Sequence, residues 1–145
     1  MVVVSHTVRV GAPVDEVFAH VDDPENHVEM TPSITAVSNV EPLDNGGKRL
    51  DYTYKMVGVS LTGTMETPEY AENNRIVFEM DGDLSGTLTW TFEAVDSATD
   101  VTYTAEYDLP GGVLGKVAEP IAVRYNEREL RTTLENLRDR LELGR

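Results

Sequence analysis

The chain has 145 residues, of which 40% are hydrophobic, and this size predicts a single compact domain over residues 1–145 with its own core. Asp and Glu number 26 against 12 Lys and Arg, so the formal net charge is −14, which opposes binding to nucleic acid and to anionic membrane surfaces. The chain contains no cysteine, which excludes disulfides, thiolate catalysis and cysteine-ligated metals.

The acidity has two interpretations: a site for a cation or basic partner, or a surface adapted to a salt-rich cytoplasm. The acidic residues are scattered along the whole chain, and only three lysines occur, at Lys48, Lys55 and Lys116. This composition favours a halophilic protein. We also find no basic leader segment at Met1 and no apolar run of the roughly 20 residues needed to cross a bilayer. The sequence therefore predicts a soluble cytoplasmic protein without integral membrane association.

The first segment, Val2–Val10, alternates with period two and predicts a strand. Pro13 suits the first turn of a helix, because its missing N–H needs no partner there, and apolar spacing predicts a short helix over residues 13–21. Asp23 can cap a second short helix that Pro24 opens and that ends near residue 31.

Alternating apolar and polar residues continue from Ser33 to Leu109, broken by short polar turns. One buried and one wet face, with short connections, are typical of antiparallel strands. The pattern predicts six further strands, at residues 34–40, 50–56, 59–66, 76–81, 84–94 and 101–109.

After Leu109 the apolar period becomes helical and remains so to the end of the chain. This predicts one long amphipathic helix, bent or restarted at Pro120. Its apolar stripe is expected to cover the inner face of the sheet and comprises Val113, Val117, Pro120, Val123, Glu127, Leu130, Leu134, Leu137 and Leu141.

The order of a strand, two short helices, six strands and a long helix resembles the helix-grip superfamily, also called SRPBCC or START-like. Its members include START lipid-transfer domains, birch-pollen-allergen-like proteins and polyketide cyclase/dehydrase proteins. The resemblance rests on the Val8–Phe18 passage, Asp23-Pro24-Glu25-Asn26, Pro32, Thr91-Phe92-Glu93-Ala94 leading into Val101-Thr102-Tyr103, and Leu134-Glu135-Asn136-Leu137.

This resemblance implies an α+β fold in which a seven-stranded curved antiparallel sheet wraps around the long C-terminal helix. It also implies a cavity between sheet and helix for a small hydrophobic ligand such as a lipid, a polyketide or an isoprenoid-like molecule. Quinone-binding members carry an aromatic-rich stretch where this chain has Met30-Thr31-Pro32-Ser33, which argues against a quinone ligand.

Residues on the predicted inner face are the candidates for ligand contact. Buried tyrosines need hydroxyl partners, and methionines suit a pliable wall, although both are also ordinary core residues. The candidates are His6, Tyr52, Tyr54, Met65, Met80, Trp90, Tyr103, Tyr107, Val123 and Glu127.

Glu127 is the one carboxylate on the predicted apolar stripe of the long helix. A buried carboxylate has a raised pKa and could act as a general acid or base together with Tyr52 or Tyr103. The alternative is a slight rotation of the helix, which would let Glu127 pair with Arg124 or Arg131. His27 could lie at the mouth of the cavity. We expect no metal and no cofactor, because no third ligand accompanies His27 and Glu29.

Three functions remain open at this point. The first is a non-catalytic binding protein for a small hydrophobic molecule, favoured because the inner face carries no convergent catalytic set. The second is a polyketide cyclase or dehydratase that uses general acid–base residues in the cavity. The third is a regulatory interaction module without a ligand. The sequence does not indicate the oligomeric state.

Overall fold

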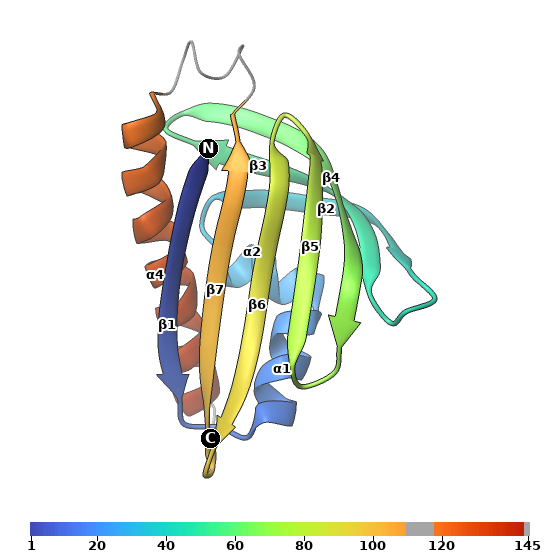
Figure 1. The fold of residues 1–145 in the computed structure, drawn as a ribbon, viewed down its shortest axis with the longest axis vertical. Coiled ribbons are helices and arrows are strands. Elements are labelled where there is room, and N and C mark those ends of the chain that lie inside the picture. Colours follow the sequence, from blue (N-terminus) through green and yellow to red (C-terminus); the bar gives the residue numbers. More distant parts are fainter. Residues whose placement is uncertain (110–117, 144–145) are drawn as a thin grey trace.

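The computed structural model describes residues 1–109 and 118–143, and its elements follow the predicted order (Figure 1). Seven antiparallel strands form one sheet in the order β1-β7-β6-β5-β4-β3-β2. The strands are β1 Val2–Val10, β2 Ile34–Pro42, β3 Lys48–Met56, β4 Val59–Ala71, β5 Arg75–Gly82, β6 Ser85–Val95 and β7 Ala98–Asp108. The helices are α1 Val14–Asp22, α2 Pro24–Met30 and α4 Glu119–Leu143. The predicted helix-grip fold is confirmed.

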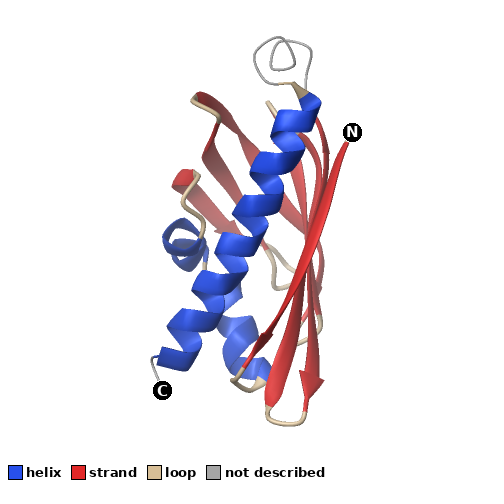
Figure 2. Ribbon diagram, turned by 90° about the vertical axis from the view of Figure 1, so that its left-hand side faces the viewer, coloured by secondary structure: helices blue, strands red, loops and turns tan. Residues whose placement is uncertain are grey.

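The sheet curves, and α4 runs along its concave side (Figure 2). α1 and α2 lie on the same side of the sheet, beside the C-terminal half of α4. Asn136 Nδ2 in that half of α4 donates to the Met30 carbonyl oxygen at 2.8 Å, which ties the end of α2 to α4. The concave space is therefore enclosed by the sheet, by α4 and by the two short helices.

Local sequence explains where the short helices begin. The Asp23 carboxylate accepts a hydrogen bond from the Glu25 N–H at 3.0 Å, and Pro24 occupies the first turn of α2. α1 starts directly after Pro13, and Asp15 and Glu16 in its first turn complement the helix dipole. The two helices thus share a single residue, Asp23, as the end of one and the cap of the other.

The predicted alternation is clearest in β7, where Val101, Tyr103, Ala105 and Tyr107 are all buried. Thr102 and Thr104 on the opposite face form hydroxyl pairs with Thr7 and Ser5 of β1, each at 2.9 Å. The buried faces of the strands pack with the helices into one core that includes Phe18, Val21, Ile76, Trp90, Phe92, Leu130, Leu134 and Leu137.

Several boundaries differ from the prediction by one to three residues, and those of β4 and α4 differ more. β4 continues to Ala71, past the expected end at residue 66, with a register shift against β5 between Glu66 and Glu69. α4 begins at Glu119, so Pro120 lies in its first turn, where a missing N–H costs nothing. The predicted helical residues Val113 and Val117 lie outside the described residues. No helix in the described ranges is long and apolar enough to span a membrane.

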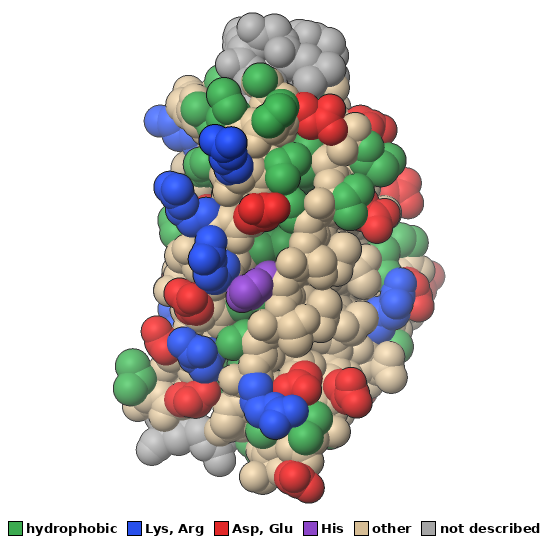
Figure 3. All heavy atoms as spheres, turned by 60° about the vertical axis from the view of Figure 1, so that its left-hand side comes forward, with side chains coloured by type: hydrophobic (Ala, Val, Ile, Leu, Met, Phe, Trp, Pro, Cys, Tyr) green, Lys and Arg blue, Asp and Glu red, His purple; other side chains and the backbone are tan. Residues whose placement is uncertain are grey.

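The charge of α4 differs from that of the rest of the chain. It carries five of the 12 basic residues, Arg124, Arg128, Arg131, Arg138 and Arg140. Over the side of the molecule formed by α4 and β1, basic and acidic side chains are interspersed (Figure 3). Most of the acidic surplus therefore lies outside α4.

Candidate functional site

Two adjoining pockets lie between the sheet and the helices. The α2 pocket takes Pro24 and His27 from α2. The α4 pocket takes Asn126, Glu129 and Leu130 from α4. The two share a wall composed of Ile34, Tyr52, Met65, Leu88 and Tyr103.

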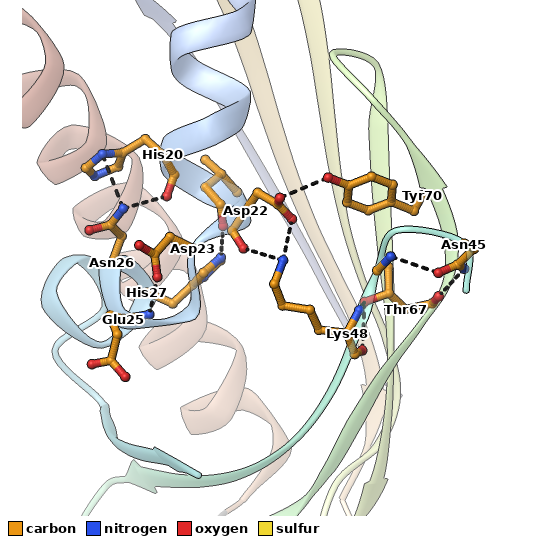
Figure 4. A network of polar contacts seen from close by, with 12 residues as sticks. His20, Asp22, Asp23, Glu25, Asn26, His27, Asn45, Lys48, Thr67 and Tyr70 are labelled. Atoms are coloured by element: carbon orange, nitrogen blue, oxygen red, sulfur yellow. Dashed lines mark hydrogen bonds and ion pairs between the residues drawn. The ribbon is translucent and has the colours of Figure 1, made fainter. Parts of the chain in front are cut away.

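A polar network surrounds Asp22 and Lys48, two residues that line the α2 pocket (Figure 4). Lys48 Nζ lies 3.0 Å from Asp22 Oδ1 and donates to the Asp22 carbonyl oxygen at 3.1 Å. The Tyr70 hydroxyl donates to the other carboxylate oxygen at 2.9 Å. These contacts fix the end of α1 to β3 and β4, far away in sequence.

His27 lines the α2 pocket and packs against the rings of Trp90 and Phe78. Its Nε2 donates to the Val21 carbonyl oxygen. Burial lowers the pKa of His27 to about 4, outweighing this hydrogen bond, which raises the pKa. The imidazole is therefore uncharged at neutral pH.

Trp90 is fully buried and stacks on Tyr103, with ring centroids 4.0 Å apart and planes 15° from parallel. The pair comes from neighbouring strands, because Trp90 of β6 is in register with Tyr103 of β7. Trp90 lines the α2 pocket, whereas Tyr103 lines both pockets. The stack thus forms a rigid aromatic wall between them.

Four tyrosines line the α4 pocket, two from β3 and two from β7. The sequence alternation predicts that all four point toward the inner face of the sheet. Burial raises the pKa of Tyr52 to about 12 and raises the pKa values of Tyr54, Tyr103 and Tyr107 above their ordinary range. Each hydroxyl therefore keeps its proton at neutral pH and is available as a donor.

A glycine makes room for one of these hydroxyls. Gly63 of β4 pairs with Tyr52 of β3, and a Cβ at Gly63 would lie 2.9 Å from the Tyr52 hydroxyl oxygen. The same Cβ would lie 2.1 Å from the Asp81 carbonyl oxygen, closer than real atoms approach. The nearby backbone of Leu84 lowers the pKa of Tyr52 and so opposes the larger effect of burial.

The prediction that Glu127 points inward is wrong, because its side chain is exposed. The buried face of α4 passes through Ala122, Asn126, Glu129, Leu130, Thr133, Leu134 and Leu137. The apolar pattern instead selected Val123, which is only half-buried, and so placed the stripe too far toward Glu127. The version of the enzyme hypothesis that pairs Glu127 with a tyrosine is therefore lost.

Glu129 occupies the buried position expected for Glu127, with 9% of its surface exposed. Its Oε1 accepts a hydrogen bond from the backbone N–H of Ser33 at 3.0 Å. Burial raises the pKa of this carboxyl, and the contacts with Ser33 oppose that rise only in part. The Glu129 charge in turn contributes to the raised pKa values of Tyr54 and Tyr103. The pocket thus holds a carboxyl group among phenols.

Asn126 is the second polar residue on the buried face of α4 that the apolar pattern missed. Its Nδ2 donates to the Tyr54 hydroxyl at 3.0 Å, whereas its Oδ1 has no hydrogen-bond partner in the described part of the chain. The Tyr52 and Tyr107 hydroxyls and Trp90 Nε1 are likewise buried without a partner among the described residues. Such a group costs about 1–3 kcal/mol when left unsatisfied. The two pockets therefore contain polar groups that residues 1–109 and 118–143 leave without a hydrogen-bond partner.

The remaining predicted residues divide into two groups. Met65 lines both pockets and Met80 lines the α4 pocket. His6 is half-buried on β1 opposite Tyr103, and Val123 is half-buried on α4, but neither lines a pocket. In residues 1–109 and 118–143, no three His, Asp or Glu side chains lie close enough together to hold a metal ion.

Sheet, terminal helix and enclosed pockets together define a helix-grip protein of the START-like class. The sequence matches, over residues 1–142, the family described as polyketide cyclase / dehydrase and lipid transport. The chain belongs to this family. No curated protein matches the sequence at a significant level.

Solved structures share the fold over nearly the whole chain. A START superfamily protein from Mycobacterium smegmatis is 21% identical with a TM-score of 0.78, and 99% of each chain is covered. A protein from Thermus thermophilus is 22% identical with a TM-score of 0.77 and 98% coverage of each chain. The Zhui aromatase/cyclase from a Streptomyces species is 18% identical with a TM-score of 0.69, covering 95% of this chain and 94% of the other. At these identities the likeness shows the fold alone.

Proposed function

We propose that the chain binds a small, mainly apolar molecule in the α2 and α4 pockets, without transforming it. The observation that carries this proposal is the shared wall of Ile34, Tyr52, Met65, Leu88 and Tyr103, which makes the two pockets neighbours along one apolar surface. Aromatic and aliphatic walls with a few polar groups are typical of small-molecule sites. The family's association with lipid transport supports the same function.

The methionines support a site that adapts to its occupant. Met65 and Met80 face each other across the β4–β5 pairing, and Met56 also lines the α4 pocket. Methionine side chains are unbranched and change shape at little cost. A molecule entering the pockets can therefore displace them without disturbing the sheet.

Titration with N-phenyl-1-naphthylamine, an uncharged fluorescent probe, tests this proposal, together with a native mass spectrum of the purified chain. We expect saturable uptake of the probe or a co-purifying molecule. Met65→Trp places a larger side chain at the shared wall and is expected to lower the affinity for the probe at least tenfold. Val3→Trp is the control, because Val3 is exposed on β1 and touches neither pocket. Absence of both a co-purifying molecule and probe uptake would contradict the proposal and favour an interaction module without a ligand.

A second candidate is general acid–base catalysis of cyclisation or dehydration, the chemistry named for part of the family. It is favoured by Glu129, a buried carboxyl of raised pKa that lines the same pocket as Tyr54 and Tyr103. The test is Glu129→Gln, which can still accept the Ser33 hydrogen bond. An enzyme would lose turnover of a bound poly-β-ketone and keep its affinity, whereas a binding protein shows no turnover in either form.

A further inference from the structure

Two buried polar groups in the α4 pocket show what part of a ligand the pocket fits. Asn126 is 4% exposed and Tyr107 is 2% exposed, and both line this pocket. Asn126 Oδ1 and the Tyr107 hydroxyl have no hydrogen-bond partner among the described residues, and neither has the Tyr52 hydroxyl at the shared wall. Buried polar groups in proteins are nearly always paired, with protein, water or ligand.

The type of partner follows from the atoms. Asn126 Oδ1 accepts only, so its partner must donate. A rotation of the amide by half a turn would present Nδ2 instead and would require an acceptor. The Tyr107 hydroxyl can donate or accept. A hydroxyl group on the ligand satisfies every one of these arrangements, because it both donates and accepts.

The charge of the pocket excludes the main alternative, a carboxylate headgroup. No Lys, Arg or His is among the described residues that line the α4 pocket, and its one ionisable acid is Glu129. Lys48 and His27 line only the α2 pocket, and Lys48 is already paired with Asp22. A buried carboxylate without a cation is costly, and the Glu129 carboxyl beside it would add repulsion.

We infer that the α4 pocket binds the hydroxyl end of an uncharged, otherwise apolar molecule, such as a phenol or an alicyclic alcohol, through Asn126 and Tyr107. This inference rests on the proposed function and adds the chemistry of the ligand to it. The apolar body of the molecule lies along the shared wall toward the α2 pocket. Fatty acids and other anionic amphiphiles are excluded.

Three probes of matched shape test the inference: 4-octylphenol, octylbenzene and ionised 4-octylbenzoate, each measured by displacement of N-phenyl-1-naphthylamine. Comparison of variants removes the difference in water solubility between the probes. Tyr107→Phe is expected to lower the affinity for 4-octylphenol at least fivefold more than it lowers the affinity for octylbenzene. Asn126→Leu is expected to have the same effect. Octylbenzoate is expected to bind at least tenfold more weakly than the phenol to the unmodified chain.

Tyr125→Phe is the matched control, because the Tyr125 hydroxyl contacts Ser33 and the Lys55 carbonyl oxygen and lines neither pocket. It should leave the ratio of phenol to octylbenzene affinity unchanged. A ratio unaffected by both Tyr107→Phe and Asn126→Leu would overturn the inference and assign trapped water as their partner. Octylbenzoate binding as tightly as the phenol would also overturn it. If no probe binds at all, the proposed function itself fails.

Discussion

The Lys48 ammonium group contacts Asp22 twice, at a carboxylate oxygen and at the carbonyl oxygen, and so joins the first residue of β3 to the last residue of α1. Tyr70 of β4 shares the same carboxylate. This contact stands at the side of the α2 pocket, and both charged side chains are about one-quarter exposed. A partly screened ion pair therefore adds to the core packing of Phe18 and Val21 in holding α1 against the sheet.

Replacing Lys48 by Met is expected to lower the free energy of unfolding by about 1 kcal/mol, because the pair is partly solvated and Tyr70 still binds Asp22. Hydrogen exchange of the α1 and α2 amides should become faster. Urea denaturation and exchange mass spectrometry measure the two effects. Arg49→Met is the control, since its contact with Glu66 is longer, at 3.5 Å, and half exposed. Equal effects of the two substitutions would show that the Asp22 contact has no special role.

Stability is expected to fall as the pH drops from about 6.5 to about 4. The folded-state pKa of His27 is about 4, below the ordinary value of 6.5, so between these values the unfolded chain binds a proton that the folded chain does not. The difference corresponds to as much as about 3 kcal/mol. His20, whose pKa is lowered by burial and by Arg140, acts in the same direction. Glu129, whose pKa is raised, acts in the opposite direction.

His27→Gln should therefore flatten the dependence of urea midpoint on pH in this range. His6→Gln, which removes an imidazole at a half-buried position of β1 outside both pockets, is the comparison variant. An unchanged slope in His27→Gln would mean that His27 accepts its proton as easily in the folded as in the unfolded chain.

Leu134→Ala is expected to cost 2–5 kcal/mol in free energy of unfolding, because Leu134 is fully buried where α4 meets the sheet. The same substitution at Leu143, which is 85% exposed on the same helix, should cost less than about 0.5 kcal/mol. Chemical denaturation compares the two variants. A small loss at Leu134 would indicate that α4 packs loosely on the strands.

The midpoint temperature of thermal unfolding is expected to rise with NaCl concentration if the chain is adapted to high salt. With a net charge of −14, the folded chain repels itself, and salt screens that repulsion. Replacing the exposed Glu79, Glu93 and Glu106 by Gln should raise the midpoint in low salt and reduce its dependence on salt. A midpoint that is constant or falls between 0.1 M and about 2 M NaCl would contradict this account.

The fold was predictable because each element carries a local signal. Period-two alternation in β7 and the Asp23-Pro24 start of α2 are decided by neighbours in sequence. The site was predictable only in part, for the same reason. The tyrosines lie on the buried face of their strands, which the period-two alternation predicts. Asn126 and Glu129 are polar residues on the buried face of α4, and a search for apolar residues at helical spacing does not find them. Their burial depends on contacts with Tyr54 and Ser33, which are distant in sequence.

The stacked pair at the wall between the pockets has a practical consequence. Trp90 is the chain's single tryptophan, and its partner Tyr103 borders both pockets. All tryptophan fluorescence of the chain therefore comes from Trp90, which makes this residue an intrinsic fluorescent reporter at the α2 pocket. A guest molecule arriving on either side changes the surroundings of that indole, and occupancy can be followed in the unlabelled, unmodified protein.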